Sequence, residues 1–203
     1  MSLATALWDA NRKAAERILA HGFVRGLGDG SLPVDSFRRY VGQDAYFLDA
    51  FARAYAFCLA HSTSREDLRD FAELIGGVLD ELRLHKFYAE RWQVDLAVVT
   101  PAGATNAYVD FLLETARRGN LGETIAAMTP CMRLYAFLGR SLSAGQVAPR
   151  YADWVTTYAD PGFEALAIRL EALLDKHATD GVTVRGNYAR AMDLEYGFFD
   201  ASL

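Results

Sequence analysis

Apolar residues recur at the spacing of one helix face along nearly the whole chain, which points to amphipathic α-helices. The first segment already follows this spacing, at Leu3, Leu7, Ala10, Ala14, Ile18 and Phe23. No convincing stretch alternates apolar and polar residues, and no pair of strand-like runs flanks a hairpin turn. We therefore predict an all-α fold without a sheet.

Turn residues divide this pattern into about seven to nine helices. We predict an opening helix that stops at Gly22, a glycine-rich turn over 26–33 and a loop over 94–104. The other predicted helices span about 34–61, 64–92, 105–118, 121–142, 149–159, 163–177 and 182–199. Helices this long suit a bundle that holds a ligand between its helices. Since no repeat or linker interrupts the pattern, residues 1–203 are expected to form a single compact domain.

Composition excludes several classes of protein. The net charge is −5 with acids and bases interspersed, which argues against a nucleic-acid-binding face. No apolar run approaches the roughly 20 residues that cross a bilayer, and charges interrupt the N-terminal segment too often for a signal peptide. Two cysteines are too few for a disulfide framework or a zinc site, so we expect a reducing, cytoplasmic setting. Cys58 is expected to pack in the core.

The segment TPCMRLYAFLG (129–139) is the clearest candidate for chemistry. Proline lacks an N–H, so Pro130 is expected to kink the helix or to occupy its first turn. A thiol near a helix start has a lowered pKa, and the thiolate is the reactive form. Cys131 is thus a candidate nucleophile, with a small buried core residue as the alternative.

Two carboxylates fall within apolar helix faces. Asp44 is flanked by aromatic and aliphatic residues, where a charge is costly unless it is paired; the alternative is a surface residue. Glu195 lies among Leu194 and aromatic residues, where burial would raise its pKa into the range useful for acid–base catalysis. The alternative is a surface glutamate paired with Arg185 or Arg190.

Other polar residues are weaker candidates. Tyr108, Tyr135 and Tyr158 offer hydroxyls and flat faces to an aromatic ligand, although ordinary core packing is the alternative. Glu81 and His85 share a helix face at the spacing of metal ligands, but a third ligand is missing. Beside Arg83 and Lys86, a solvated or structural role is the simpler expectation for this pair.

Six segments, in this order, resemble blocks of the TenA/THI-4 family, also called thiaminase II or aminopyrimidine aminohydrolase. They are HGFVRGLGDGSLPVDSFRRYVGQDAYFLDAFARAYA (21–56), ELRLHKFYAERWQVD (81–95), TPAGATNAYVDFLLETARRG (100–119), TPCMRLYAFLG (129–139), YADWVTTYADPGF (151–163) and LEYGFFDAS (194–202). Gly22 stands where the family usually has proline, and Phe199 where many members have tryptophan. The resemblance covers almost the whole chain, and Cys131 places it in the cysteine-containing branch.

The resemblance implies a helical bundle like that of haem oxygenase, usually a homotetramer. It implies thiamin salvage without a metal or organic cofactor. The substrate would be 4-amino-5-aminomethyl-2-methylpyrimidine, which yields the hydroxymethylpyrimidine and ammonia, or thiamin, which yields the pyrimidine and the thiazole.

The resemblance also implies roles for particular residues. Cys131 would be the nucleophile, Glu195 the acid and base, and Asp44 the acceptor of hydrogen bonds from the ring nitrogen and exocyclic amine. The substrate-binding residues would be Asp44, Phe47, Tyr108, Tyr135, Tyr158 and Phe198, with Phe47 and Tyr158 on the two faces of the ring.

Two other interpretations stay open. Relatives with this fold bind haem or a quinone precursor, and a shared fold does not fix the function. A non-catalytic small-molecule-binding or regulatory protein is the second alternative, against which the set of Cys131, Asp44 and Glu195 argues.

Overall fold

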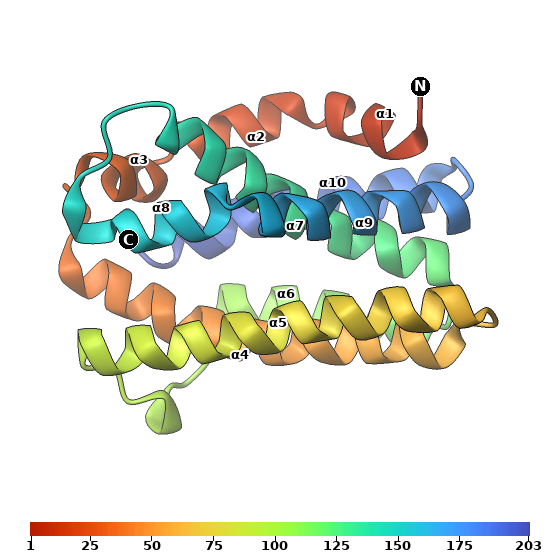
Figure 1. Cartoon of the computed structure of the whole chain (residues 1–203), viewed down its shortest axis with the longest axis horizontal. Coiled ribbons are helices and arrows are strands. Elements are labelled where there is room, and N and C mark those ends of the chain that lie inside the picture. Colours follow the sequence, from red (N-terminus) through yellow and green to blue (C-terminus); the bar gives the residue numbers. More distant parts are fainter.

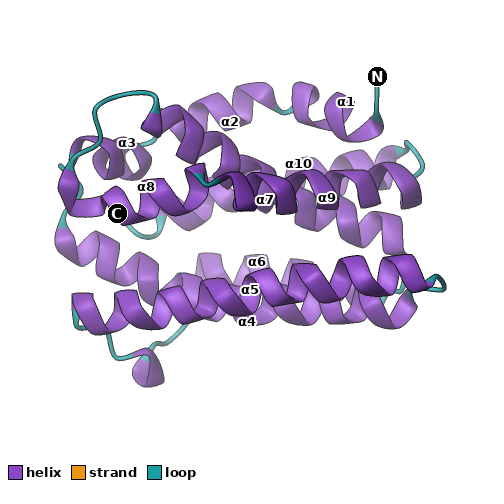
Figure 2. Ribbon diagram, viewed as in Figure 1, coloured by secondary structure: helices purple, strands orange, loops and turns teal.

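The computed structural model describes residues 1–203 and contains helices joined by short turns, with no strand (Figure 2). Its α-helices are α1 (Leu3–Ala10), α2 (Arg12–Leu19), α3 (Gly22–Asp29), α4 (Val34–His61), α5 (Arg65–Trp92), α6 (Gly103–Arg117), α7 (Leu121–Ser143), α8 (Ala152–Ala159), α9 (Pro161–His177) and α10 (Val182–Asp200). Short 3-10 turns occur at Leu96–Val98 and Pro149–Tyr151. The all-α prediction is confirmed, and none of the helices is both long and apolar enough to cross a membrane.

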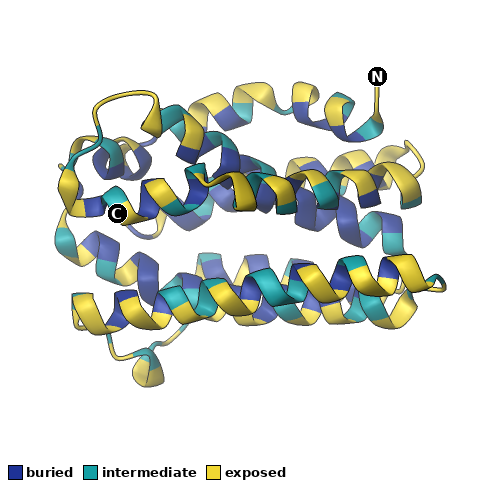
Figure 3. Cartoon of the chain, viewed as in Figure 1, coloured by how far each residue is buried: buried dark blue, intermediate teal, exposed yellow.

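The helices form layers around a central helix (Figure 1). Helices α4, α5 and α6 lie together along one side, and α4 packs against both of the others. Helix α7 packs against α8, α9 and α10 and also contacts α4 and α6. Most of α7 is buried, so residues on it face several neighbouring helices at once (Figure 3).

The two longest helices follow the sequence prediction closely. Helix α4 begins and ends as expected, and α5 begins one residue after Ser64. The Ser64 hydroxyl accepts a hydrogen bond from the Asp67 backbone N–H at 3.0 Å. This contact satisfies one of the unpaired amides of the first turn and fixes where α5 starts.

The prediction for the N-terminal segment is wrong in detail. The helix breaks at Asn11, and Gly22 begins α3 instead of ending a helix. His21 caps α3 by accepting a hydrogen bond from the Phe23 N–H on its Nδ1 atom. The predicted turn over 26–33 shrinks to its second half, where Gly30 has a φ of 78° that favours glycine.

Pro130 neither starts nor ends a helix, because α7 continues through it. The missing N–H leaves the Ala126 carbonyl without its usual donor four residues later. Cys131 therefore lies in the middle of α7, far from the partial positive charge at a helix N-terminus.

Gly139 allows α7 to approach the end of α8 closely. A Cβ atom at this position would lie 2.6 Å from both the Ala159 nitrogen and the Tyr158 carbonyl oxygen. Only a residue without a side chain fits this contact. The close approach brings Tyr158 against the face of α7 that carries Tyr135.

The C-terminus is attached to the start of α4. The Leu203 carbonyl oxygen accepts hydrogen bonds from Ser36 at 3.0 Å and from Arg39 at 2.5 Å. These bonds hold the end of α10 beside α4, the helices that carry Glu195 and Asp44 respectively.

Candidate functional site

A small internal cavity lies at the junction of α4, α5, α7, α8 and α9. Its wall includes Asp44, Phe47, Glu81, Cys131, Tyr135 and Tyr158. Its free space of about 10 Å³ is far below the roughly 300–1,000 Å³ of common ligand pockets, so side chains of the wall must move apart before a ring can enter. The cavity brings together five residues that the sequence singled out for the site, and it adds Glu81.

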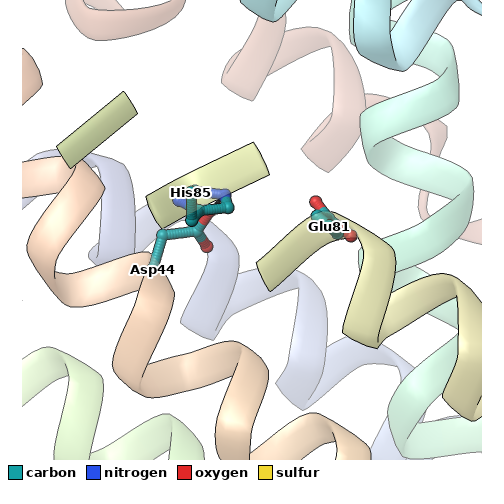
Figure 4. A group of neighbouring side chains, drawn as sticks. All are labelled: Asp44, Glu81 and His85. Carbon is teal, nitrogen blue, oxygen red and sulfur yellow. Dashed lines mark ion pairs between the residues drawn. The ribbon is translucent and has the colours of Figure 1, made fainter. Parts of the chain in front are cut away.

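Asp44 faces His85 across the contact between α4 and α5 (Figure 4). The Nε2 atom of His85 lies 2.9 Å from the Asp44 Oδ2 atom, and both side chains are buried. Burial opposes protonation of the ring, but the charges of Asp44 and Glu81 outweigh it and raise the pKa of His85. Asp44 is therefore an inward-facing carboxylate, and the surface alternative is wrong.

Glu81 lies one helical turn before His85 and lines the same cavity. Its Oε1 atom accepts a 2.6 Å hydrogen bond from the Tyr158 hydroxyl. Burial, helped by the charge of Asp44, raises the pKa of Glu81 to about 7. Of the two expected roles for this pair, the solvated one is wrong, because His85 is buried and Glu81 is half-buried, and the structural one agrees with these contacts. The spacing of Glu81 and His85 was visible in the sequence, but charged neighbours on other helix faces suggested solvent.

Cys131 reaches the cavity from the middle of α7. Burial raises the pKa of its thiol well above the usual value, and the charges of Glu195, Glu81 and Asp44 add to the effect. The expectation of a lowered pKa is wrong, because Cys131 is distant from a helix start and surrounded by carboxylates. A protonated thiol at this position needs a base before it reacts.

Glu195 lies close to Cys131 without lining the cavity. It is only 1% exposed, and its Oε1 atom accepts a 2.8 Å hydrogen bond from the Tyr108 hydroxyl. Burial raises the pKa of Glu195 to about 8, although the hydrogen bond from Tyr108 opposes the shift. The alternative of a surface glutamate paired with an arginine is wrong.

The aromatic candidates form two groups. Tyr135 and Tyr158 line the cavity, with ring centres 4.7 Å apart in an edge-to-face contact. Tyr108 and Phe198 lie behind Phe47, at centre-to-centre distances of 4.6 and 5.8 Å. Tyr108 therefore contacts Phe47 and Glu195 without lining the cavity, while Tyr135, Tyr158 and Phe47 form part of its wall.

Asp44 adds a third possible metal ligand to Glu81 and His85, which the sequence had offered as a pair. Their donor atoms all lie within 4.8 Å of one another. The same atoms already serve other contacts, His85 with Asp44 and Glu81 with Tyr158. A cation would have to displace both contacts, so we assign the group to ion pairing and hydrogen bonding.

Comparison of folds places the chain among known helical proteins. A TenA family transcription regulator from Silicibacter sp. TM1040 superposes with a TM-score of 0.91 at 25% identity, over 98% of this chain and 95% of that protein. Haem oxygenase-1 from the cyanobacterium Synechocystis sp. PCC6803 superposes with a TM-score of 0.67 at 17% identity, over 99% of this chain and 92% of that one. The predicted haem-oxygenase-like fold is confirmed.

Comparison of sequences identifies the family. The aminopyrimidine aminohydrolase of Halalkalibacterium halodurans is 32% identical over 88% of this chain and 83% of its own length. The bifunctional TH2 protein of Arabidopsis thaliana is 34% identical over 88% of this chain, which spans only 34% of that longer protein. Residues 8–203 match the TENA/THI-4/PQQC family. The chain is a member of the TENA/THI-4/PQQC family.

Proposed function

We propose that this protein is an aminopyrimidine aminohydrolase of the thiaminase II type, which acts in thiamin salvage. The observation that carries the proposal is the meeting of Cys131 and Asp44 in the wall of one small cavity, with Glu195 close enough to Cys131 to affect the pKa of its thiol. A nucleophile, a hydrogen-bond acceptor for the ring and an acid–base group are the three parts that the reaction needs. The name of the Halalkalibacterium relative supports the same activity.

The aminopyrimidine ring would lie between Phe47 and Tyr158, and Asp44 would accept hydrogen bonds from its nitrogen and exocyclic amine. The buried ion pair with His85 keeps a positive charge beside Asp44. An ionised Asp44 favours the protonated, electron-poor ring. Such a ring is the form that a sulfur nucleophile attacks.

The first half of the reaction forms a carbon–sulfur bond. Because the pKa of Glu195 is about 8, the ionised fraction that can act as a base grows as the pH rises towards that value. In this form Glu195 takes the proton of the Cys131 thiol, and the thiolate adds to a ring carbon. The electron pair displaced from that carbon moves into the ring, where the protonated nitrogen holds it. Tyr108 donates to Glu195 at 2.8 Å and keeps this carboxylate in position.

The second half breaks the bond to the leaving group. The ring electrons expel ammonia from the aminomethyl carbon, and Glu195 returns its proton to the leaving nitrogen. Glu195 then takes a proton from water as the oxygen adds to the same carbon, and loss of the Cys131 sulfur restores the aromatic ring. The net change is hydrolysis of one carbon–nitrogen bond.

Cys131→Ala tests the proposal. We expect turnover of 4-amino-5-aminomethyl-2-methylpyrimidine to disappear, while the hydroxymethyl product still binds. Cys58→Ala is the matched control, since Cys58 is a buried cysteine on α4 that does not line the cavity. Ammonia release at the wild-type rate by Cys131→Ala would rule out covalent catalysis.

A parallel assay with thiamin distinguishes the two candidate substrates. The thiazole of thiamin is much larger than ammonia and would require a wider opening of this nearly closed cavity. We therefore expect kcat/KM to be higher for the aminomethyl compound. No turnover of either compound by folded protein would favour a non-catalytic binder.

We also propose that the protein is a homotetramer, as the family resemblance implies. A groove between α4 and α6, which includes Ala50, Phe57, Val109 and Leu113, offers apolar surface for a contact between copies. Light scattering should then give about four times the 22.4 kDa of one chain; the mass of a single chain would contradict it.

A further inference from the structure

The proposed reaction leaves one proton without a source. The ring nitrogen must carry a proton when sulfur adds, yet Asp44 only accepts hydrogen bonds and Glu195 receives the proton of the thiol. The cavity wall holds a second carboxyl beside that of Asp44, the half-buried Glu81, to which this chemistry has assigned no part.

The position of Glu81 suits contact with the same end of the ring as Asp44. Donor atoms of these two carboxyls lie within 4.8 Å of each other. The Tyr158 hydroxyl engages only the Oε1 atom of Glu81, which leaves Oε2 for a ligand. Since Tyr158 is also a proposed face of the ring site, the Glu81 carboxyl is held beside bound substrate.

We propose that Glu81 is a second acid–base residue of this site, which donates a proton to the ring nitrogen of the bound aminopyrimidine and takes it back when the ring regains aromaticity. This inference rests on the proposed function. It assigns separate proton transfers to two glutamates, with Glu195 serving the sulfur and the leaving group and Glu81 serving the ring.

The electrostatic surroundings support a proton on Glu81 in the free protein. Several titratable groups on the helices packed around Glu81 interact electrostatically with its carboxyl. They are Asp44, Tyr40 and Tyr55 of α4, His85 and Tyr88 of α5, Cys131 of α7 and Tyr158 of α8. Among them His85 alone forms a cation, and its charge is paired with Asp44. The pKa of Glu81 is accordingly raised to about 7, chiefly by burial, so this carboxyl exchanges its proton near neutral pH.

The proton count closes over one turnover. When the ring binds, the Glu81 proton moves to the ring nitrogen and Glu81 becomes ionised. After ammonia has left and water has added, the sulfur departs and takes up the proton that Glu195 gained from water. The ring nitrogen then returns its proton to Glu81, and both glutamates regain their starting states.

Glu81→Gln is the decisive variant, because glutamine still accepts the hydrogen bond from Tyr158 but does not titrate. We expect kcat/KM for the aminomethylpyrimidine to fall about 100-fold or more near pH 7, the range for loss of a general acid. The pH profile carries the sharper prediction. The ratio of wild-type to Glu81→Gln kcat/KM should fall about tenfold per pH unit above pH 7, because only the wild type loses an active proton there.

Comparing the two profiles as a ratio removes the titration of the substrate, which both proteins share. Glu90→Gln is the matched control: it makes the same substitution on the same helix at an exposed position, and it should match the wild type. Glu81→Asp keeps the acid and should restore the pH-dependent fall at a lower rate. A constant ratio of wild type to Glu81→Gln across pH would overturn the assignment and leave Glu81 a structural role.

Ultraviolet spectra of the bound hydroxymethyl product separate this inference from the proposed function. Wild type should bind the protonated ring at a pH where the free ring is neutral, and Glu81→Gln should bind a smaller protonated fraction, because only Asp44 then favours the proton. Equal spectra in the two proteins would refute the role of Glu81 while leaving the site intact. Absence of both binding and turnover in the wild type would overturn the proposed function and this inference together.

Discussion

Replacement of Glu195 by glutamine should remove activity and at the same time stabilise the fold at alkaline pH. Glu195 is 1% exposed, and burial raises its pKa to about 8 from a usual value of 4.5. The folded protein therefore keeps this group protonated over a pH range in which the unfolded chain ionises it. Between these two values each rise in pH weakens the wild-type fold, because the native state binds the extra proton.

The size of the effect follows from the two pKa values. Each pKa unit corresponds to about 1.36 kcal/mol. The stability that a proton on Glu195 confers is almost fully present below pH 4.5 and is lost as the pH rises towards about 8. Between pH 5 and pH 8 the wild type should lose about 3–4 kcal/mol from this group alone.

Glutamine does not ionise, so Glu195→Gln should escape that loss. Its amide oxygen still accepts from Tyr108, and any unpaired amide N–H adds a cost of about 1–3 kcal/mol that does not vary with pH. The difference in unfolding free energy between variant and wild type should therefore move by about 3–4 kcal/mol in favour of the variant from pH 5 to pH 8.

Urea denaturation of both proteins at several pH values measures this difference, with loss of circular dichroism as the readout. Glu171→Gln is unsuitable as a control because Glu171 is paired with Arg133, whereas Glu90→Gln changes an exposed glutamate and should follow the wild type at every pH. A difference between Glu195→Gln and wild type that stays constant from pH 5 to pH 8 would refute the reasoning.

Three further substitutions test the site and its support. Asp44→Asn should lower both product affinity and kcat, because the amide no longer favours a protonated ring; unchanged product affinity on titration would remove Asp44 from the ring contact. Tyr108→Phe removes a hydrogen bond that lowers the pKa of Glu195, so the rising limb of the pH–rate profile should move to higher pH. A limb that does not move would contradict the role of Glu195 as the base. Gly139→Ala should cost about 1–3 kcal/mol in urea denaturation, since its Cβ meets the backbone of Tyr158 and Ala159. Wild-type stability in Gly139→Ala would show that α8 is free to shift.

Helix positions were the most predictable part of the structure. The ranges of α4 and α5 follow from apolar periodicity and, at the start of α5, from the Ser64 cap, which are local properties of the chain. The N-terminal break was missed because Gly22 is as compatible with a helix start as with a stop. His21 decides between them through a side-chain cap that composition does not reveal.

The candidate site was predictable only in part. The family blocks named Cys131, Asp44 and Glu195, and their apolar flanks were consistent with burial. Nothing in the sequence pattern distinguished Glu81 from a surface glutamate. Its contact with the cavity wall includes a hydrogen bond from Tyr158 of α8, which lies 77 positions away along the chain.

The helical fold class, the limits of the long helices and membership of the family could all be read from the chain, because they depend on local spacing and on ordered motifs. The tertiary structure alone decided the protonation states of the site. It placed Cys131 in the middle of a buried helix among carboxylates, so that the pKa of its thiol is raised instead of lowered. It also joined Asp44 to His85 and Glu81 to Tyr158. A pKa depends on burial and on charges brought close by packing, and those distances exist only in the folded chain.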